Sequence, residues 1–471
     1  MAQTFFFYDL ETSGLNPRQD RIMQFAGQRT DMSLEPIGEP YNLLVALNDD
    51  TLPSPDALMV TGITPQKTVE EGYTEAQFAR MLSEEIFTPE TVAVGFNNIR
   101  FDDEFIRHLL WRNFHDPYEW SWKNGRSRWD LLDVVRLTRA LRPEGVNWPL
   151  DDKGEPSNRL ELITSANGIA HENAHDALAD VTALIAVTKL IKQKQPQLYD
   201  YLLKMRDKKL VQRLVNVDDK KPFVYASGRY DNEFAKTTVA FPLTTSRNGG
   251  VVVYDLRYDS TPFVGLSAEE LSAKIFASWE ERQAEDFVKL PVKELQYNRC
   301  PAVAPLGVLE QGDGWRKISL DLKTVQKHQN ILLNHPDFAE KLRGIFENKP
   351  AFKKLPDPEA QLYDGFLNDR DRIRVEAVRN ADERELADFH PEFQDERLAP
   401  LLLHYKARNF PRSLSEDDLA QWEIWRAQHL QAQLPGFMAS LQRLASTATD
   451  EQQFILQELQ LWAEAVLPSS D

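Results

Sequence analysis

The chain has 471 residues, a length that suggests two to four domains. Acidic residues outnumber basic ones by 73 to 55, and the net charge of -18 argues against nonspecific adhesion to polyanions, although a local basic groove can coexist with an acidic remainder. A single cysteine, Cys300, excludes an intramolecular disulfide and fits a reducing compartment. The N-terminus lacks the features of a signal peptide, and no apolar run approaches ~18 residues. We therefore expect a cytoplasmic protein with no membrane partner.

The sequence pattern of the first ~195 residues predicts an α/β domain. Extended runs at 4–10, 21–31 and 39–47, separated by turn-rich segments, predict an antiparallel meander. One further strand and a series of helices with a 3.6-residue apolar period follow, with the strand at 91–97 and the helices at 74–87, 100–114, 129–141 and 174–193. Gly168 is expected to cap a short helix at 159–167, and Pro196 to end the long one.

A charged segment at 205–222 predicts a domain boundary or an exposed helix. After it, the sequence pattern changes from one that is mainly helical to one that is typical of strands. Strand candidates separated by turn residues predict a small β-barrel or sheet, and they lie at 222–230, 237–246 and 249–259, with a hairpin signal at Asn248-Gly249-Gly250. A helix at 267–279 follows. The Pro-rich segment 348–361 predicts a linker, and the remainder is helical, for example at 416–434 and 451–467.

Two carboxylates, Asp9 and Glu11, end the apolar run FFFYDLE. In a strand, residues i and i+2 point to the same face, so the two like charges cost stability unless a cation, a proton or a basic group lies between them. Such a pair is weak evidence by itself, because two solvated surface acids would give the same pattern. The unbroken apolar run before them instead places these acids at a strand end beside the core.

A second element follows the strand at 91–97. Asn97 precedes Phe101 by four residues, and Asp102 comes next, at the beginning of an amphipathic helix. The alternative is that Asp102 or Asp103 stands there because acids favour the positive end of a helix dipole.

A third element is HENAHDALAD, in which His175 and Asp180 lie five residues apart. That spacing is about one and a half helical turns, so both side chains can face a common site. His171 and Asp176 have the same spacing and compete for the same role, while Asp176 would also suit an N-cap.

In this order, the three elements resemble the 3'-to-5' exonucleases that carry four acidic residues and a histidine on a ribonuclease-H-like fold, over about residues 4 to 193. The segments GFNNIRFDDEF, SRWDLLDVVR, ALRPEGVNWP, ANGIAHENAHDALADV, AQLYDGF and YKARNFP narrow the resemblance to the bacterial exonuclease I family, single-strand-specific deoxyribonucleases, over essentially the whole chain. One departure is Ser13, where this family has an aromatic residue. This difference leaves the carboxylate pair unchanged, but contacts with the substrate near Ser13 can differ from those of the family.

The resemblance implies an α/β fold with three domains. A ribonuclease-H-like mixed-sheet nuclease domain is expected over 1–197, a small SH3-like β-barrel-containing domain over 198–348 and an all-helical C-terminal domain over 354–471. The later domains would close around the strand, and the protein would act as a monomer.

The implied activity is a metal-dependent 3'-to-5' exonuclease that degrades single-stranded DNA to mononucleotides in DNA repair and recombination. Two Mg²⁺ ions per active site, with Mn²⁺ as an alternative, fit hard carboxylate ligands. By resemblance, Asp9, Glu11 and Asp180 hold the metal that carries the attacking water, Asp9 bridges to the second metal, and Asp102 supports that second metal. His175 is the expected general base.

The expected DNA contacts lie in the first domain. Leu58, Met59, Phe101 and Trp129 are candidates to pack against bases, and Arg100, Arg126, Arg128 and Arg159 to contact phosphates. The alternative for each is that the aromatic residues are core and the arginines pair with acids. The resemblance also implies docking of the acidic, aromatic-ended C-terminal tail of single-stranded DNA-binding protein at Arg142, Tyr201 and Lys221.

Two other functions remain open. An enzyme of the same fold could act on short RNA or on polymerase errors, although the long extension beyond the nuclease domain argues against a minimal ribonuclease. A non-enzymatic scaffold would be preferred if any of the four acids Asp9, Glu11, Asp102 and Asp180 were missing, and none is.

Overall fold

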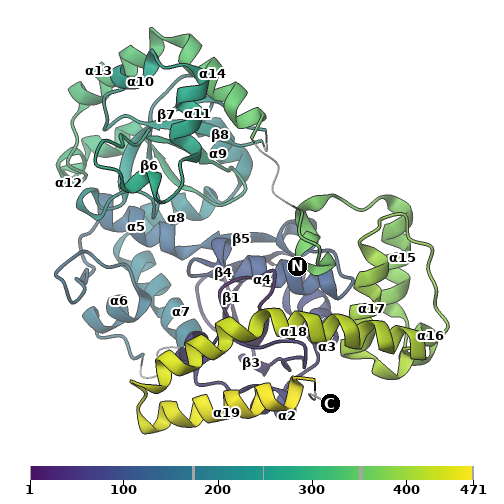
Figure 1. The fold of residues 1–471 in the computed structure, drawn as a ribbon. Coiled ribbons are helices and arrows are strands. Elements are labelled where there is room, and N and C mark those ends of the chain that lie inside the picture. The colour runs from purple at the N-terminus through teal and green to yellow at the C-terminus, as the bar shows by residue number, and fades with distance from the viewer. Residues whose placement is uncertain (1, 172–175, 248, 350–353, 469–471) are drawn as a thin grey trace. The chain divides into compact units, whose positions relative to one another are not determined.

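The computed structural model describes residues 2–171, 176–247, 249–349 and 354–468 (Figure 1). Its internal packing distinguishes two compact units. The first unit combines residues 1–127, 171–184 and 353–471, and the second combines 128–170 and 185–352. None of the helices in the described part of the chain is long and apolar enough to cross a membrane. The domain boundaries expected from the sequence stay a prediction.

The first sheet contains both parallel and antiparallel strands. Strands β1 (Thr4–Thr12), β2 (Ile22–Thr30) and β3 (Tyr41–Leu44) form the predicted antiparallel meander, and β4 (Thr91–Gly95) pairs with β1 in parallel. The strand order is β3-β2-β1-β4-β5, where β5 is the short strand Ser127–Asp130. The mixed sheet predicted for a ribonuclease-H-like domain is therefore confirmed.

Strand β1 extends beyond its parallel partner at the carboxyl edge. Its pairing with β4 runs as far as Phe7 opposite Val94, whereas its pairing with β2 continues through Asp9 and Glu11. The chain leaves β4 through Asn97, whose φ of 69° is a left-handed conformation that Asn tolerates, and then enters helix α4 (Asp102–Arg112). Because parallel strands end at the same edge, the end of β1 and the start of α4 come together.

One face of β1 packs into the apolar core of the first unit. Phe6, Tyr8 and Leu10 alternate onto one face and belong to a buried apolar cluster. This cluster also receives side chains from α3 (Glu75–Met81), from the π-helical turn Leu82–Ile86 and from α4. The helix expected at 74–87 is thus an α-helix that ends in a π-helical turn.

The C-terminal helices complete the first unit (Figure 1). Two short helices that the sequence did not predict are α1 (Pro55–Thr61) and α2 (Pro65–Glu71). Helix α19 (Asp450–Val466) packs on both of them, and helix α18 (Glu416–Ala445) packs on α1. The other elements of this region are the 3-10 segment η8 (Pro358–Asp364) and helices α15 (Asp369–Asn380), α16 (Glu383–Ala387) and α17 (Leu398–Asn409). The predicted helical C-terminus is confirmed.

Further helices follow the first sheet along the chain: α5 (Leu131–Leu141), α6 (Leu160–Ala166), α7 (Ala177–Lys194), α8 (Pro196–Lys204) and α9 (Lys208–Leu214). Gly168 follows Asn167, the C-cap of α6, and has a φ of 64°, as expected of a glycine that ends a helix. Pro196 lies just after the end of α7 and is also the first residue of α8, a position that suits proline.

The second unit contains an antiparallel five-stranded sheet of order β10-β6-β7-β8-β9. Its strands are β6 (Phe223–Ala226), β7 (Thr237–Thr245), β8 (Val251–Asp255), β9 (Val292–Leu295) and β10 (Ala302–Pro305). The first three were predicted, and the last two, of four residues each, were not. The accompanying helices are α10 (Thr261–Val264), α11 (Ala268–Phe276), α12 (Gly314–Lys317), α13 (Leu322–Leu333) and α14 (Pro336–Glu347).

Candidate metal centre

Three predicted carboxylates meet in the first unit. Asp9 and Glu11 project from the end of β1, and Asp180 projects from the first turn of α7. One ligand oxygen from each of these side chains lies within 4.8 Å of the other two. All three residues are half-buried, so the group combines close approach with partial removal from water.

The charges of this group repel one another. Burial and the carboxylates of Asp102, Glu11 and Asp180 raise the pKa of Asp9 well above its usual value. Burial and the carboxylates of Asp180, Asp102 and Asp176 raise the pKa of Glu11 to about 8. Every cause acts in the same direction, which is the electrostatic condition that a bound cation relieves. The donor set consists of hard oxygens, which fits Mg²⁺ or Mn²⁺.

Asp102, the fourth predicted acid, is the first residue of α4 and is buried. It lies outside the group of three but close enough for its charge to raise the pKa of Asp9. A buried polar contact that the sequence did not reveal lies next to it. The Tyr8 hydroxyl donates a hydrogen bond to Asp103 Oδ1, and Asn98 Nδ2 donates to the same oxygen at 3.2 Å. This contact ties the residue before Asp9 to the residue after Asp102.

The predicted general base, His175, lies outside the described residues. Its competitor His171 places Nε2 at 2.5 Å from Asp180 Oδ1. Asp176 accepts hydrogen bonds from the backbone N–H groups of Leu178 and Ala179, both at 3.1 Å. The N-cap alternative for Asp176 is therefore confirmed.

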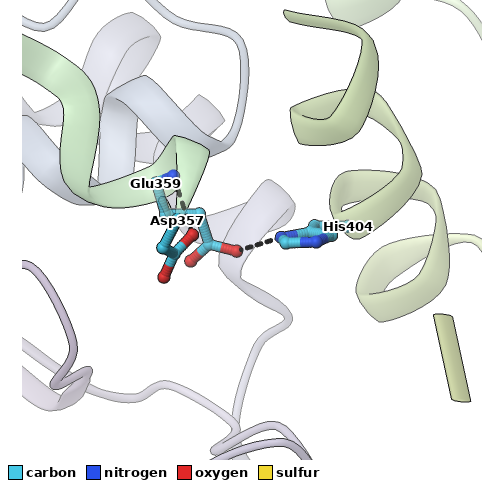
Figure 2. Close-up of side chains that lie close together, drawn as sticks. All are labelled: Asp357, Glu359 and His404. Carbon is cyan, nitrogen blue, oxygen red and sulfur yellow. Dashed lines mark hydrogen bonds and ion pairs between the residues drawn. The ribbon is translucent and has the colours of Figure 1, made fainter. Parts of the chain in front are cut away.

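A second group of the described residues, Asp357, Glu359 and His404, also has ligand atoms within 4.8 Å of one another (Figure 2). Glu359 is already neutralised, because Arg21 pairs with one of its oxygens at 2.9 Å, and Arg408 pairs with the other. His404 Nδ1 also donates to Glu359, at 2.8 Å. A metal ion would have to displace two buried guanidinium groups, so this group is an ion-pair network.

The same network includes Asp50. Burial opposes its ionisation, but Arg408 at 2.6 Å and Arg21 at 3.8 Å lower the pKa of Asp50 to about 2. Two carboxylates thus face two guanidinium groups in a fully buried environment. This balance is the opposite of the repulsion among Asp9, Glu11 and Asp180.

The predicted base-packing residues differ in exposure. Leu58 is fully buried in a cluster with side chains of α18 and α19. Trp129 is 1% exposed and packs edge-on against Tyr199. Burial favours the core alternative for these two residues. Met59 and Phe101 are half-buried and keep accessible surface.

The predicted phosphate-binding arginines also differ in exposure and in the groups that they contact. Arg126 donates from Nε to the Phe87 carbonyl at 2.6 Å, and Arg128 donates to the Asn298 carbonyl at 2.9 Å. Arg159 is exposed and pairs with Glu161 at 3.4 Å. Arg100 is exposed and precedes Phe101.

The three predicted partner-binding residues lie in the second unit. Arg142 donates to Gln311 Oε1 at 3.2 Å, and the Tyr201 hydroxyl donates to the Val303 carbonyl at 3.2 Å. Lys221 is exposed and lies 3.7 Å from Asp219.

Known protein families match the chain in three successive stretches. The exonuclease model matches residues 6–188, the exonuclease I SH3-like domain matches 206–348, and the exonuclease I C-terminal domain matches 356–466. Exodeoxyribonuclease I of Haemophilus influenzae is 41% identical over 450 residues, which cover 95% of each chain. The chain belongs to the exodeoxyribonuclease I family.

Solved structures of exodeoxyribonuclease I agree with this assignment. The chain is similar to E. coli exonuclease I in complex with a dA16 oligonucleotide, with a TM-score of 0.94 and 38% identity over 99% of this chain and 100% of the other. It is equally similar, with the same TM-score, identity and coverage, to the zinc-bound form of the complex of that enzyme with single-stranded DNA. The three-part architecture expected from the sequence is confirmed by the family models and these structures.

Proposed function

We propose that this protein is a metal-dependent 3'-to-5' exonuclease that degrades single-stranded DNA to mononucleotides and acts in DNA repair and recombination. The observation that carries the proposal is the meeting of Asp9, Glu11 and Asp180 within 4.8 Å. Carboxylates at this separation raise the pKa values of Asp9 and Glu11, and a bound divalent cation would relieve that repulsion. Membership of the exodeoxyribonuclease I family supports the same activity.

Asp9, Glu11, Asp180 and Asp102 would hold two Mg²⁺ ions, with Mn²⁺ as an alternative. When bound, such ions supply the positive charge that a phosphodiester needs as its phosphorus becomes pentacovalent. The protein's own part is to hold four carboxylates in place before the ions arrive. Strand β1 fixes two of them on one face, and the first turns of α4 and α7 each contribute one.

His175 would accept the proton of the attacking water, because a neutral imidazole has a suitable basicity near pH 7. In the sequence it lies five residues before Asp180. His171 instead contacts Asp180 directly, which suits a residue that orients the carboxylate.

The proposed contacts with single-stranded DNA use half-buried and exposed side chains. Met59 and Phe101 would pack against bases, and Arg100 and Arg159 would contact phosphates. Leu58, Trp129, Arg126 and Arg128 stay predictions, and each already has a structural role in the protein.

A partner is proposed for the second unit. The acidic, aromatic-ended tail of single-stranded DNA-binding protein would bind at Arg142, Tyr201 and Lys221, with the enzyme acting as a monomer. Fluorescence anisotropy with a peptide of that kind tests this. Arg142→Ala and Lys221→Ala should each weaken binding, whereas Lys323→Ala, at an exposed residue of the same unit, should not. Equal affinities for all variants would remove this partner site.

The substrate class is tested with matched single-stranded DNA, single-stranded RNA and blunt duplex DNA, each with Mg²⁺ or with a chelator. The proposal requires degradation of the single-stranded DNA alone and its loss with the chelator. Preference for RNA would keep the fold and replace the function. Failure to digest any of them would favour the non-enzymatic scaffold.

A further inference from the structure

Two C-terminal segments, AQLYDGF and YKARNFP, contribute no carboxylate to the candidate metal centre. The first lies in and just after η8, and the second spans the end of α17. Both elements belong to the first unit, together with the carboxylates, and η8 packs against both α17 and α4. The C-terminal region therefore reaches an element that carries a proposed metal ligand.

Element η8 contacts helix α4 through the Tyr363 side chain and the Pro358 carbonyl. The Tyr363 hydroxyl donates to Glu104 Oε2 at 2.5 Å. Arg107 Nη1 donates to Glu104 Oε1 at 2.9 Å and to the Tyr363 hydroxyl at 3.3 Å. Farther along the helix, Trp111 Nε1 donates to the Pro358 carbonyl at 3.0 Å. These contacts fix the helix whose first residue is Asp102, two residues before Glu104.

The same element holds the loop that follows Glu11. Glu359 Oε2 accepts from Arg21 Nη2 at 2.9 Å. The backbone of Arg21 is in turn bonded to Ser13, since its N–H donates to Ser13 Oγ at 2.9 Å and its carbonyl accepts from the Ser13 N–H at 2.8 Å. Ser13 lies two residues after Glu11, so the ion pair restrains the point where the chain leaves β1.

Glu359 is itself immobilised from α17. Arg408 and His404 both bind its Oε1 atom. The side chains of Arg21, Glu359 and Arg408 are exposed by only 3%, 1% and 2%. Buried ion pairs of this kind add little net stability compared with apolar packing, but their geometry is narrowly defined. A positioning role accounts for that geometry better than a role in stability alone.

We propose that η8 and α17 are positioning elements of the metal centre. Tyr363 sets the start of α4 and hence Asp102, and Glu359 sets Arg21 and hence the chain after Glu11. This inference rests on the proposed function, because it concerns the same carboxylates. It adds that the C-terminal region determines metal affinity, besides any contact that it makes with the DNA strand.

Tyr363→Phe is the test variant, because it removes one hydroxyl from a side chain that is 46% exposed and leaves the ring. Tyr258→Phe is the matched control. Tyr258 is 41% exposed, lies in the second unit and donates to Asp231 Oδ2 at 3.4 Å. Arg21→Lys is a second test variant, which keeps the charge beside Glu359 but loses the guanidinium that donates to both Glu359 and the Gln19 carbonyl.

The primary measurement is Mn²⁺ affinity by isothermal titration calorimetry in the absence of DNA, with melting temperature and the Mg²⁺ dependence of DNA degradation recorded alongside. Tyr363→Phe and Arg21→Lys should weaken Mn²⁺ binding roughly three- to tenfold, less than the roughly 10- to 100-fold cost of losing a direct contact to a metal ligand, because neither side chain bonds to one of the proposed ligands. The half-saturating Mg²⁺ concentration should rise by a similar factor while KM for DNA stays unchanged. Tyr258→Phe should change neither quantity.

The outcomes separate this inference from the proposed function. If wild-type protein degrades DNA with Mg²⁺ and Tyr363→Phe binds Mn²⁺ as tightly as wild type, the positioning role is wrong and the nuclease function stands. The same holds if the variant only melts at a lower temperature. If wild-type protein neither binds Mn²⁺ nor degrades DNA, both fail. Should Arg21→Lys not fold, Tyr363→Phe decides alone.

Discussion

His171 Nε2 lies 2.5 Å from Asp180 Oδ1. Because a carboxylate oxygen accepts hydrogen bonds, the imidazole donates from Nε2, and that nitrogen is not available to take a proton from water. His175 stays our predicted base. We expect His175→Ala to lower kcat by about 10²- to 10⁴-fold, the usual contribution of a general base, with little change in strand affinity. Single-turnover kinetics and anisotropy binding measure the two effects separately.

His171→Ala is the companion variant. It should leave kcat at saturating Mg²⁺ within a few-fold of wild type, because only the orientation of Asp180 is affected. The opposite pattern, a large loss in His171→Ala and a small one in His175→Ala, would transfer the role of base to His171.

Asp9→Asn should abolish activity without destabilising the metal-free protein. The carboxylate of Asp9 lies among those of Asp102, Glu11 and Asp180, which raise its pKa, so removing its charge relieves repulsion. The melting temperature in EDTA should equal or exceed that of wild type. A clear decrease would contradict the electrostatic account of the site.

Mg²⁺ should stabilise wild-type protein more than Asp9→Asn. A ligand that binds the native state alone raises the free energy of unfolding by mass action, and the variant lacks a central carboxylate. Differential scanning fluorimetry across a Mg²⁺ series measures the shift in melting temperature. Equal shifts for the two proteins would argue against a metal centre at Asp9.

The metal-free protein should lose stability as pH rises from about 4.5 to 8. The pKa of Glu11 is raised from its usual 4.5 to about 8, so over this interval the unfolded chain releases the proton while the folded chain retains it. The contribution of Glu11 to the free energy of unfolding is fully present below pH 4.5 and is lost above pH 8. Urea unfolding in EDTA at pH 5 and pH 8 should show a larger decrease for wild type than for Glu11→Gln. Parallel decreases would mean that Glu11 does not titrate in this range.

Arg100→Ala should weaken binding to single-stranded DNA and reduce the slope of log K against log salt by about 0.7, the value for one lost phosphate contact on a single strand. Lys323→Ala offers a comparison, because Lys323 is an exposed residue of the second unit that has no proposed contact with the strand. We expect that variant to leave the salt slope unchanged. An unchanged slope for Arg100→Ala would remove Arg100 from the strand path.

The sequence predicted the parts of the site that local spacing controls. Two acids separated by one residue at a strand end must share a face, which places Asp9 and Glu11 together without any knowledge of the fold. The antiparallel meander and the long helices were likewise visible, because their apolar periods extend over many residues. Helices α1 and α2, of seven residues each, complete only about two turns, which is too short for a helical apolar period to be recognised.

Long-range polar contacts gave no local signal. Arg21 and Glu359 are 338 residues apart, and Tyr363 and Glu104 are 259 apart. In the sequence, Arg21 and Glu359 look like ordinary surface charges, and only the packing of the C-terminal region on the nuclease sheet brings such residues together. Trp129 presents a different difficulty. An aromatic side chain suits base stacking, but Trp129 is buried in the core. Its hydrophobicity is equally compatible with both roles.

The measurement that tests the central claim most directly is digestion of one single-stranded DNA, labelled at either its 5' or its 3' end, by wild-type protein and by Asp9→Asn with Mg²⁺. We predict that wild type shortens the 5'-labelled strand stepwise and releases the 3' label at once as a mononucleotide, and that the variant does neither. Early release of the 5' label, or equal digestion by the variant, would contradict a 3'-to-5' exonuclease centred on Asp9.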